Sequence, residues 1–245
     1  MTNYQIRLQY IGTRYSGWQT QKNRQTIQGC IVKTIHQITG KTVSIIGAGR
    51  TDSGVHAMGQ VANFKLPKMI PISKLKSSLN GILPWDIRIQ RVKHVHANFH
   101  AQKDALKKRY EYRIYNGRIL SPFLNGYVHH ARVRLDLEAI EESMQYIKGS
   151  HDFSSFAATA TQVKNRTRTI FLSQIINRGN HIRYQVEANG FLHHMVRNIV
   201  GTLLEIGLNR LKPSDISEIM KAKDRKKAGP TAPPHGLHLM RVFYK

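Results

Sequence analysis

Apolar and polar residues alternate from Tyr4 to Tyr10, and this period of two predicts a half-buried β-strand. Apolar residues then recur at helical spacing from Ile27 to Ile38, after Thr26, which can cap a helix, and before Gly40, which can end one. Other segments before residue 100 show similar spacing. They predict strands at 43–48, 61–66 and 87–95, a helix at 72–82 that ends before Pro84, and an irregular glycine-rich segment at 49–59.

The same succession of elements begins again after residue 105. Each half has about four strands and two helices, and hairpin turns are frequent. We therefore predict an α+β fold of two similar halves, each a mainly antiparallel sheet with helices on one face. The predicted domains are residues 1–103 and 104–245. The elements of the second half are strands at 109–115, 170–176, 182–188 and 237–244, helices at 136–147, 191–206 and 214–220, and a hairpin turn at 177–180.

The net charge of the chain indicates the kind of partner that it binds. The chain has 38 Lys and Arg residues against 14 Asp and Glu residues, a formal net charge of +24. Such an excess attracts polyanions, because each cation placed near a phosphate releases condensed counterions. A nucleic-acid partner is therefore expected, either for an enzyme or for a non-catalytic basic protein.

Cysteine content and hydropathy indicate the compartment. Cys30 is the single cysteine, which excludes an intramolecular disulfide and a cysteine-based zinc site. The N-terminal residues lack the pattern of a signal peptide, and no apolar run approaches the ~18 residues of a membrane span. A cytoplasmic protein without membrane contact is expected.

Residues 47–56 form a glycine-rich segment that carries one acid, Asp52. A dinucleotide-binding fingerprint fails here, because Asp52 stands at its third glycine position. A phosphate-binding loop fails as well, because Val55-His56 replaces the required Lys-Ser/Thr pair. The cationic surroundings, including Arg50, favour an ionised carboxylate that can act as a nucleophile or a base. A purely structural Asp that bonds its own turn is the alternative.

Two histidine pairs raise the question of a metal. His193 and His194 are adjacent, and neighbours on a helix point about 100° apart, so they do not form a chelating pair. His94 and His96 have a spacing that could share a metal on a strand, but no third ligand is evident. We predict no metal.

Five ordered motifs resemble the signature of the tRNA pseudouridine synthase A family. The central one is the segment around Asp52, from Gly47 to Ala57 followed by Gln60-Val61. The others span nearly the whole chain. They are Tyr10-x-Gly12-Thr13-x-Tyr15-x-Gly17-Trp18-Gln19-x-Gln21, Phe99-His100-Ala101 with Lys108-Arg109-Tyr110-x-Tyr112, Asn189 to Asn198, and Ala228 to Pro234 with Gly236-Leu237-x-Leu239.

The resemblance implies two α+β halves with a basic cleft between them, a homodimer, no cofactor, and tRNA as the substrate, at uridines 38, 39 and 40 of the anticodon stem-loop. It implies that Asp52 is the catalytic aspartate and that Arg50 helps to displace the base. Tyr110 would stack on the target base, Arg197 would supply a cation that pairs with the aspartate, and Leu237 would line the pocket. Taken alone, Tyr110 and Leu237 are ordinary core residues, and Arg197 is an ordinary cation on a helix.

Three positions depart from the family pattern. Ile11 stands where the family usually has Asp, Gln102 where it has Arg, and Ser53 where it has Ala. None of them is a proposed catalytic residue.

Two other functions are weighed against an isomerase. A metal-dependent nuclease needs several clustered carboxylates, and the key segment has one. A non-catalytic RNA-binding module with the same fold is compatible with the charge and must be separated by experiment.

Overall fold

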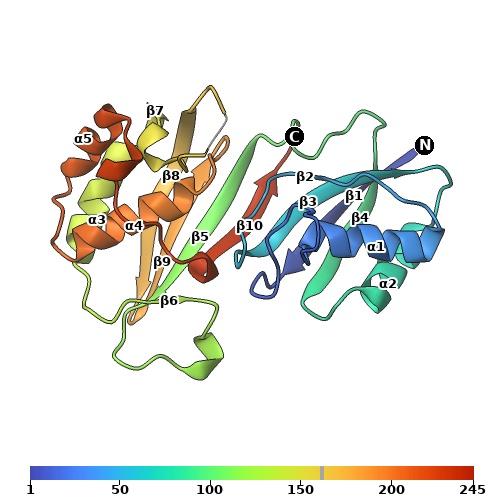
Figure 1. Cartoon of the computed structure of the whole chain (residues 1–245), viewed down its shortest axis with the longest axis horizontal. Coiled ribbons are helices and arrows are strands. Elements are labelled where there is room, and N and C mark those ends of the chain that lie inside the picture. The colour runs from blue at the N-terminus through green and yellow to red at the C-terminus, as the bar shows by residue number, and fades with distance from the viewer. Residues whose placement is uncertain (161–162) are drawn as a thin grey trace. The chain divides into compact units, whose positions relative to one another are not determined.

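The computed structural model describes residues 1–160 and 163–245, and these form two compact units (Figure 1). The first unit comprises Met1–Leu106 and Leu239–Lys245, and the second comprises Lys107–His238. The inner boundary lies close to the one expected from the sequence, but the last seven residues join the first unit instead of the second. They do so through long-range contacts, which local patterns do not reveal. The Leu106 amide donates to the Phe243 carbonyl at 2.9 Å, and the Tyr244 hydroxyl donates to the Ala101 carbonyl at 2.6 Å.

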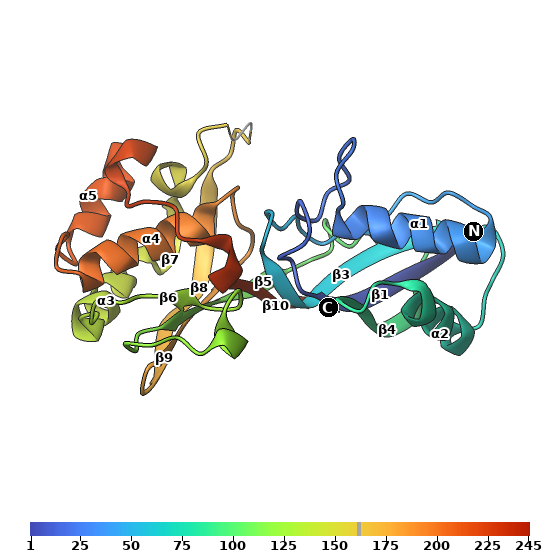
Figure 2. The same cartoon turned by 60° about the horizontal axis from the view of Figure 1, so that its bottom comes forward.

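The first unit contains a sheet in the order β4-β1-β3-β10, with the short strand β2 paired to β3. The β1–β3 and β1–β4 pairs are antiparallel, and α1 runs along β3 and β1 on one side of the sheet (Figure 2). Its elements are β1 (Thr2–Tyr10), α1 (Ile27–Thr39), β2 (Ile46–Gly47), β3 (His56–Leu66), α2 (Ile72–Ile82), β4 (Ile87–Val95) and most of β10 (Leu237–Phe243).

Alternation along β1 explains how this unit forms its core. Tyr4, Ile6 and Leu8 are fully buried, as are Ile31 of α1 and Leu79 of α2. Burying such side chains contributes roughly 1.5–3 kcal/mol each, before the entropy cost of ordering them. The residues between them, such as Arg7, therefore project from the opposite face of the sheet.

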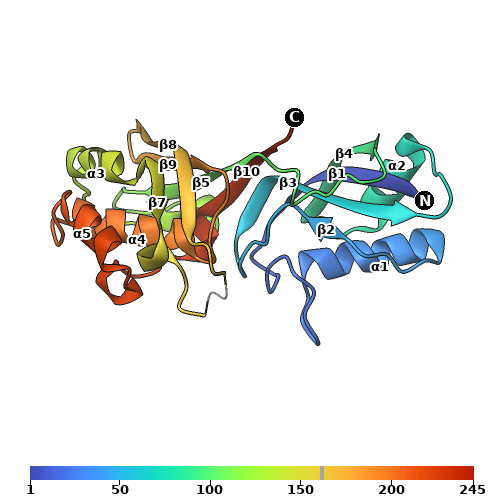
Figure 3. The same ribbon diagram turned by 90° about the horizontal axis from the view of Figure 1, so that it is seen from above.

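The second unit contains a sheet in the order β5-β9-β8-β7, with β6 parallel to β5. The other strand pairs are antiparallel, and α4 packs on one side of this sheet (Figure 3). Its elements are β5 (Lys107–Tyr115), β6 (His129–His130), α3 (Leu137–Met144), β7 (Gly149–Asp152), β8 (Thr167–Arg178), β9 (His181–Ala188), α4 (Met195–Gly207) and α5 (Asp215–Ala222).

The core of the second unit again comes from one face of alternating strands. Tyr112 on β5 lies opposite Tyr184 on β9, and both side chains are buried together with Ile199 and Leu203 of α4. Gly179 adopts a left-handed φ of 61° in the turn between β8 and β9, which confirms the expected hairpin.

The α+β fold expected from the sequence is confirmed, and so are most elements. Helix α1 is capped by Thr26, whose hydroxyl accepts from the Gly29 amide at 3.2 Å, and it ends at Gly40 in the left-handed conformation. Several predictions were wrong in their bounds, among them the strand expected at 61–66, which is the second half of β3. Only Ile46–Gly47 of the strand expected at 43–48 is a strand, the irregular segment expected at 49–59 ends where β3 begins at His56, and the helix expected at 191–206 begins at Met195.

No helix in the described part of the chain combines the length and the apolar composition that crossing a lipid bilayer requires.

Candidate active-site loop

Asp52 lies on a connection between β2 and β3 whose backbone is fixed at several points. The Ala48 amide donates to the Val61 carbonyl at 2.7 Å, and the Val55 amide donates to the Asp52 carbonyl at 3.2 Å. Gly54 has a φ of 79°, which L side chains rarely adopt. Asp52 itself is half-buried on this turn.

The segment that follows β1 packs against this loop through backbone contacts. The Trp18 amide donates to the Thr51 carbonyl at 3.0 Å. A side chain at Gly17 would come within 2.6 Å of the same carbonyl, and one at Gly12 within 1.9 Å of the Val55 carbonyl. Glycine is therefore required at both positions if the two loops are to touch. Sequence reasoning missed this packing, although the two glycines were its signal.

Side chains hold the same loop through a buried polar network. The Tyr10 and Thr51 hydroxyls are 2.8 Å apart, and the Gln60 amide nitrogen donates to the Gly49 carbonyl at 2.9 Å and to the Tyr10 hydroxyl at 3.4 Å. Burial raises the pKa of Tyr10 to about 12, and its hydrogen bonds with Thr51 and Gln60 only partly oppose this. Tyr10 thus stays neutral at physiological pH and holds the loop by hydrogen bonding.

The imidazole of His56 anchors the C-terminal end of the loop, where β3 begins. Its Nδ1 accepts from the Gly12 amide at 3.1 Å, and the ring is buried. At the near end, Arg50 is exposed. The loop therefore presents a cation and a half-buried carboxylate on a backbone that is fixed on both sides.

Tyr110 belongs to the second unit, where it faces the helix side of β5. Its ring is 6% exposed and meets Phe191 edge-to-face, with centroids 5.0 Å apart and planes at 85°. Phe191 precedes α4, so the two aromatic rings join the strand to the segment that leads into the helix.

Arg197 lies on α4 of the second unit and fastens the loop that precedes β10. Its Nε donates to the Ala232 carbonyl at 2.8 Å, and the Ala232 amide donates to the Arg197 carbonyl at 3.1 Å. Its charge also acts nearby. Burial raises the pKa of Tyr112 and the charge of Arg197 opposes this shift, whereas burial and Arg197 both lower the pKa of His235.

The next residue on α4 completes the attachment of that loop. The Asn198 Oδ1 accepts from the Thr231 hydroxyl at 2.7 Å and from Arg225 at 3.1 Å, while its Nδ2 donates to the Phe156 carbonyl at 2.7 Å. Leu237, the first residue of β10, is 5% exposed. The Ala228–Pro234 motif is therefore a packed structural element.

The histidine pairs have local structural partners. His194 precedes α4 in a left-handed conformation with φ of 62°, so the helix geometry assumed for His193 and His194 was wrong; their ring centroids are 4.0 Å apart. His94 meets Tyr4 edge-to-face at 4.9 Å, whereas His96 meets Phe99 at 6.0 Å.

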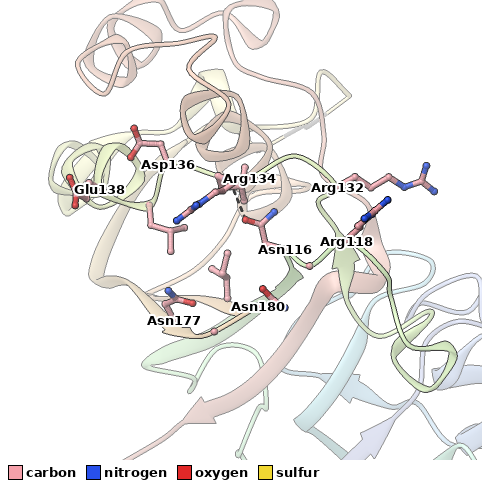
Figure 4. A pocket seen from close by; sticks show the side chains of 13 residues that line it. Asn116, Arg118, Arg132, Arg134, Asp136, Glu138, Asn177 and Asn180 are labelled. Carbon is pink, nitrogen blue, oxygen red and sulfur yellow. Dashed lines mark hydrogen bonds between the residues drawn. The ribbon is translucent and has the colours of Figure 1, made fainter.

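A hollow of about 790 Å³ lies in the second unit and contains none of the predicted site residues (Figure 4). It borders the start of α3 and the turn between β8 and β9, and the side chain of Asn116, one of its lining residues, accepts from the Leu135 amide at 3.0 Å. Charges of both signs line it: Arg118, Arg132, Arg134, Asp136 and Glu138.

Comparison with known proteins places the two units in one family. The sequence profile of the family described as tRNA pseudouridine synthase matches residues 7–102 and 144–245. Proteins named tRNA pseudouridine synthase A are similar over 244 residues and the full length of both chains. They are 44% identical in Thermoanaerobacter sp. (strain X514), 43% in Caldicellulosiruptor saccharolyticus and 41% in Acetivibrio thermocellus. The chain belongs to the tRNA pseudouridine synthase family.

Proposed function

We propose that this protein isomerises uridine to pseudouridine in tRNA, at positions 38, 39 and 40 of the anticodon stem-loop, with Asp52 as the catalytic residue. Family membership supports the reaction and the substrate class. The observation that carries the role of Asp52 is its half-buried carboxylate on a loop fixed by the Tyr10–Thr51–Gln60 network.

The reaction explains why a fixed carboxylate suits this task. Pseudouridine formation breaks the bond between the sugar and a ring nitrogen, turns the uracil, and joins a ring carbon to the same sugar atom. Atoms and electrons balance without a redox partner or an energy source. An ionised Asp52 can attack the ring, attack the sugar, or abstract a sugar proton, and a fixed loop keeps it oriented for whichever step it performs.

Four other residues are proposed to contact the substrate. Tyr110 has an aromatic face suited to stacking on an extruded base, which must leave its stack at a cost of a few kcal/mol. Arg50 supplies a cation that helps to displace the base, and Arg197 supplies the cation expected to pair with the aspartate. Leu237 supplies apolar surface for the pocket.

We further propose a homodimer in the cytoplasm. A single cysteine suits a reducing compartment, and tRNA is the substrate class of the family. Light scattering of the purified protein tests the dimer, for which twice the 28.1 kDa chain mass is expected. A monomer at micromolar concentration would contradict this proposal.

The decisive experiment replaces the carboxylate and keeps its shape. We expect Asp52→Asn to abolish pseudouridine in an unmodified tRNA transcript and to leave tRNA affinity within about threefold, because the carboxylate acts in chemistry and not in phosphate binding. Base-resolution mapping measures product, and a binding titration measures affinity.

The matched control is Asp104→Asn, because Asp104 is an exposed loop carboxylate in the same unit. It should retain full activity. If wild-type protein bound the transcript and formed no pseudouridine, the chain would be a binding module. If Asp52→Asn kept full activity, the assignment of Asp52 would fail.

A further inference from the structure

The face of the first sheet opposite its buried core carries a cluster of cations. Arg7, Arg91, Lys93 and Arg241, here called the cationic face, line a shallow hollow of about 240 Å³. All four residues are exposed. The hollow belongs to the first unit alone, because every lining residue lies in Met1–Leu106 or Leu239–Lys245.

Acids are missing from this cluster. The other lining residues are neutral: Gln5, Gly59, Val61, Val242 and Tyr244. Among the residues that the structure describes, no carboxylate forms an ion pair with any member of the cationic face. The positive charge of this face is therefore not neutralised within the protein.

Strand register makes the arrangement costly for the free protein. Arg7 of β1 lies directly opposite Arg91 of β4, and Gln5 lies opposite Lys93. Like charges directly opposite each other on neighbouring strands are destabilising. An anion bound between them would convert this repulsion into attraction, and arginine is well shaped to hold phosphate through paired N–H groups.

One cation on this face is also held in position by an aromatic ring. The guanidinium carbon of Arg241 lies 4.7 Å from the centroid of the Phe243 ring, two residues along the same strand. A cation–π contact of this kind restricts the side chain and leaves its N–H groups able to bind an anion.

We propose that the cationic face is a second RNA-binding surface, which holds backbone phosphates of the tRNA at a distance from the chemistry of Asp52. This inference rests on the proposed tRNA substrate. RNA fits better than a second copy of the chain, because a two-fold contact through this face would place cations against cations. Contacts to phosphates position an RNA without reading its sequence.

The test removes two charges from the face and compares them with two charges removed elsewhere on the same unit. The test variant is Arg7→Gln with Arg91→Gln. The control is Lys74→Gln with Lys76→Gln, which changes two exposed cations of α2 and the net charge equally. Affinity for an unmodified tRNA transcript is measured by titration at several salt concentrations.

We expect the test variant to lose roughly tenfold in affinity, and the slope of log affinity against log salt to become shallower by about 1.4–1.8, at 0.7–0.9 for each lost phosphate contact. The control should keep the wild-type slope. At saturating tRNA the test variant should still form pseudouridine at the wild-type rate, so the loss appears in KM.

Equal affinity and slope in the two variants would overturn this proposal while leaving the Asp52 assignment intact. Denaturation of the test variant checks the fold, which should be at least as stable as wild type because a like-charge pair has been removed. Loss of pseudouridine at every tRNA concentration would also contradict the proposal, because the residues would then act in chemistry.

Discussion

Each sheet has a face opposite its buried core, and the two faces differ in whether their cations have acid partners. In the first unit Arg7 faces Arg91, and none of the described residues that line the hollow beside them is acidic. In the second unit each acid on the corresponding face contacts two cations: Glu187 pairs with Lys107 and Arg109, and Glu111 with Arg113 and Arg183. The same strand alternation thus gives one face whose cations share acid partners, here called the paired face, and one whose cations have no acid partner among the described residues, the cationic face, here called unpaired.

Burial sharpens this difference. Glu111 and Glu187 are 1% and 4% exposed although they lie on alternating strands, and both contact cations from the same face. Removing an acid from the paired face leaves its cations without an anion and is therefore destabilising, whereas on the unpaired face like charges lie opposite each other in the free protein.

The largest change in the free energy of unfolding should come from removing one acid of the paired face. We expect Glu187→Gln to lower the free energy of unfolding by about 2 kcal/mol, because Lys107 and Arg109 lose their anion. Both cations are more than a third exposed, so solvent screening keeps the loss below that of a fully buried pair. Urea denaturation measures it.

The matched control for that substitution is Glu218→Gln, which breaks an exposed ion pair with Lys221 on α5. It should change stability by less than about 0.5 kcal/mol. Equal losses of unfolding free energy in both variants would show that the ion pairs of the paired face contribute no more than an exposed pair.

A smaller effect should appear in the pH dependence of stability, through the titration of Glu187. Burial alone raises the pKa of Glu187, but hydrogen bonds and charge from Lys107 and Arg109 outweigh it, so the folded pKa lies below its ordinary value of 4.5. The stabilisation is therefore fully present above pH 4.5 and is lost as the pH falls through the folded pKa. The difference in the free energy of unfolding between wild type and Glu187→Gln should be smaller at pH 3 than at pH 7. A constant difference would contradict this assignment.

The smallest effect should come from the unpaired face, with the opposite sign. We expect Arg7→Gln to raise the free energy of unfolding by up to about 0.5 kcal/mol at low salt, because repulsion from Arg91 is removed. Added salt should erase the gain by screening. The control Lys74→Gln removes the same charge from α2, and an equal gain there would point to net charge alone.

Local patterns were sufficient for elements whose signals lie close together in the chain. Thr26 and Gly40 define α1, and the glycine-rich segment marks the loop that carries Asp52. The support of that loop was not predictable, because Gly12 and Gly17 contact residues about 35 to 45 positions away and only the folded chain shows which backbone they approach.

Strand register and the burial of charged side chains could not be predicted from local sequence patterns for the same reason. Alternation places Arg7 and Arg91 on polar faces, but their opposition depends on pairing between distant strands. The partners of Glu111 likewise include Gln185 and Arg183 from a different strand, whereas a charged residue in an alternating strand is ordinarily read as exposed.

The final strand has a consequence for biosynthesis. β10 pairs beside β3 in the first unit, where a side chain at Gly59 would come within 2.4 Å of the Met240 carbonyl, so strands made early and late in translation touch. A ribosome adding about 5–20 residues per second completes the segment up to Leu106 well before it makes the last seven residues. The strand that follows the Asp52 loop therefore gains this neighbour only after the whole second unit has been synthesised.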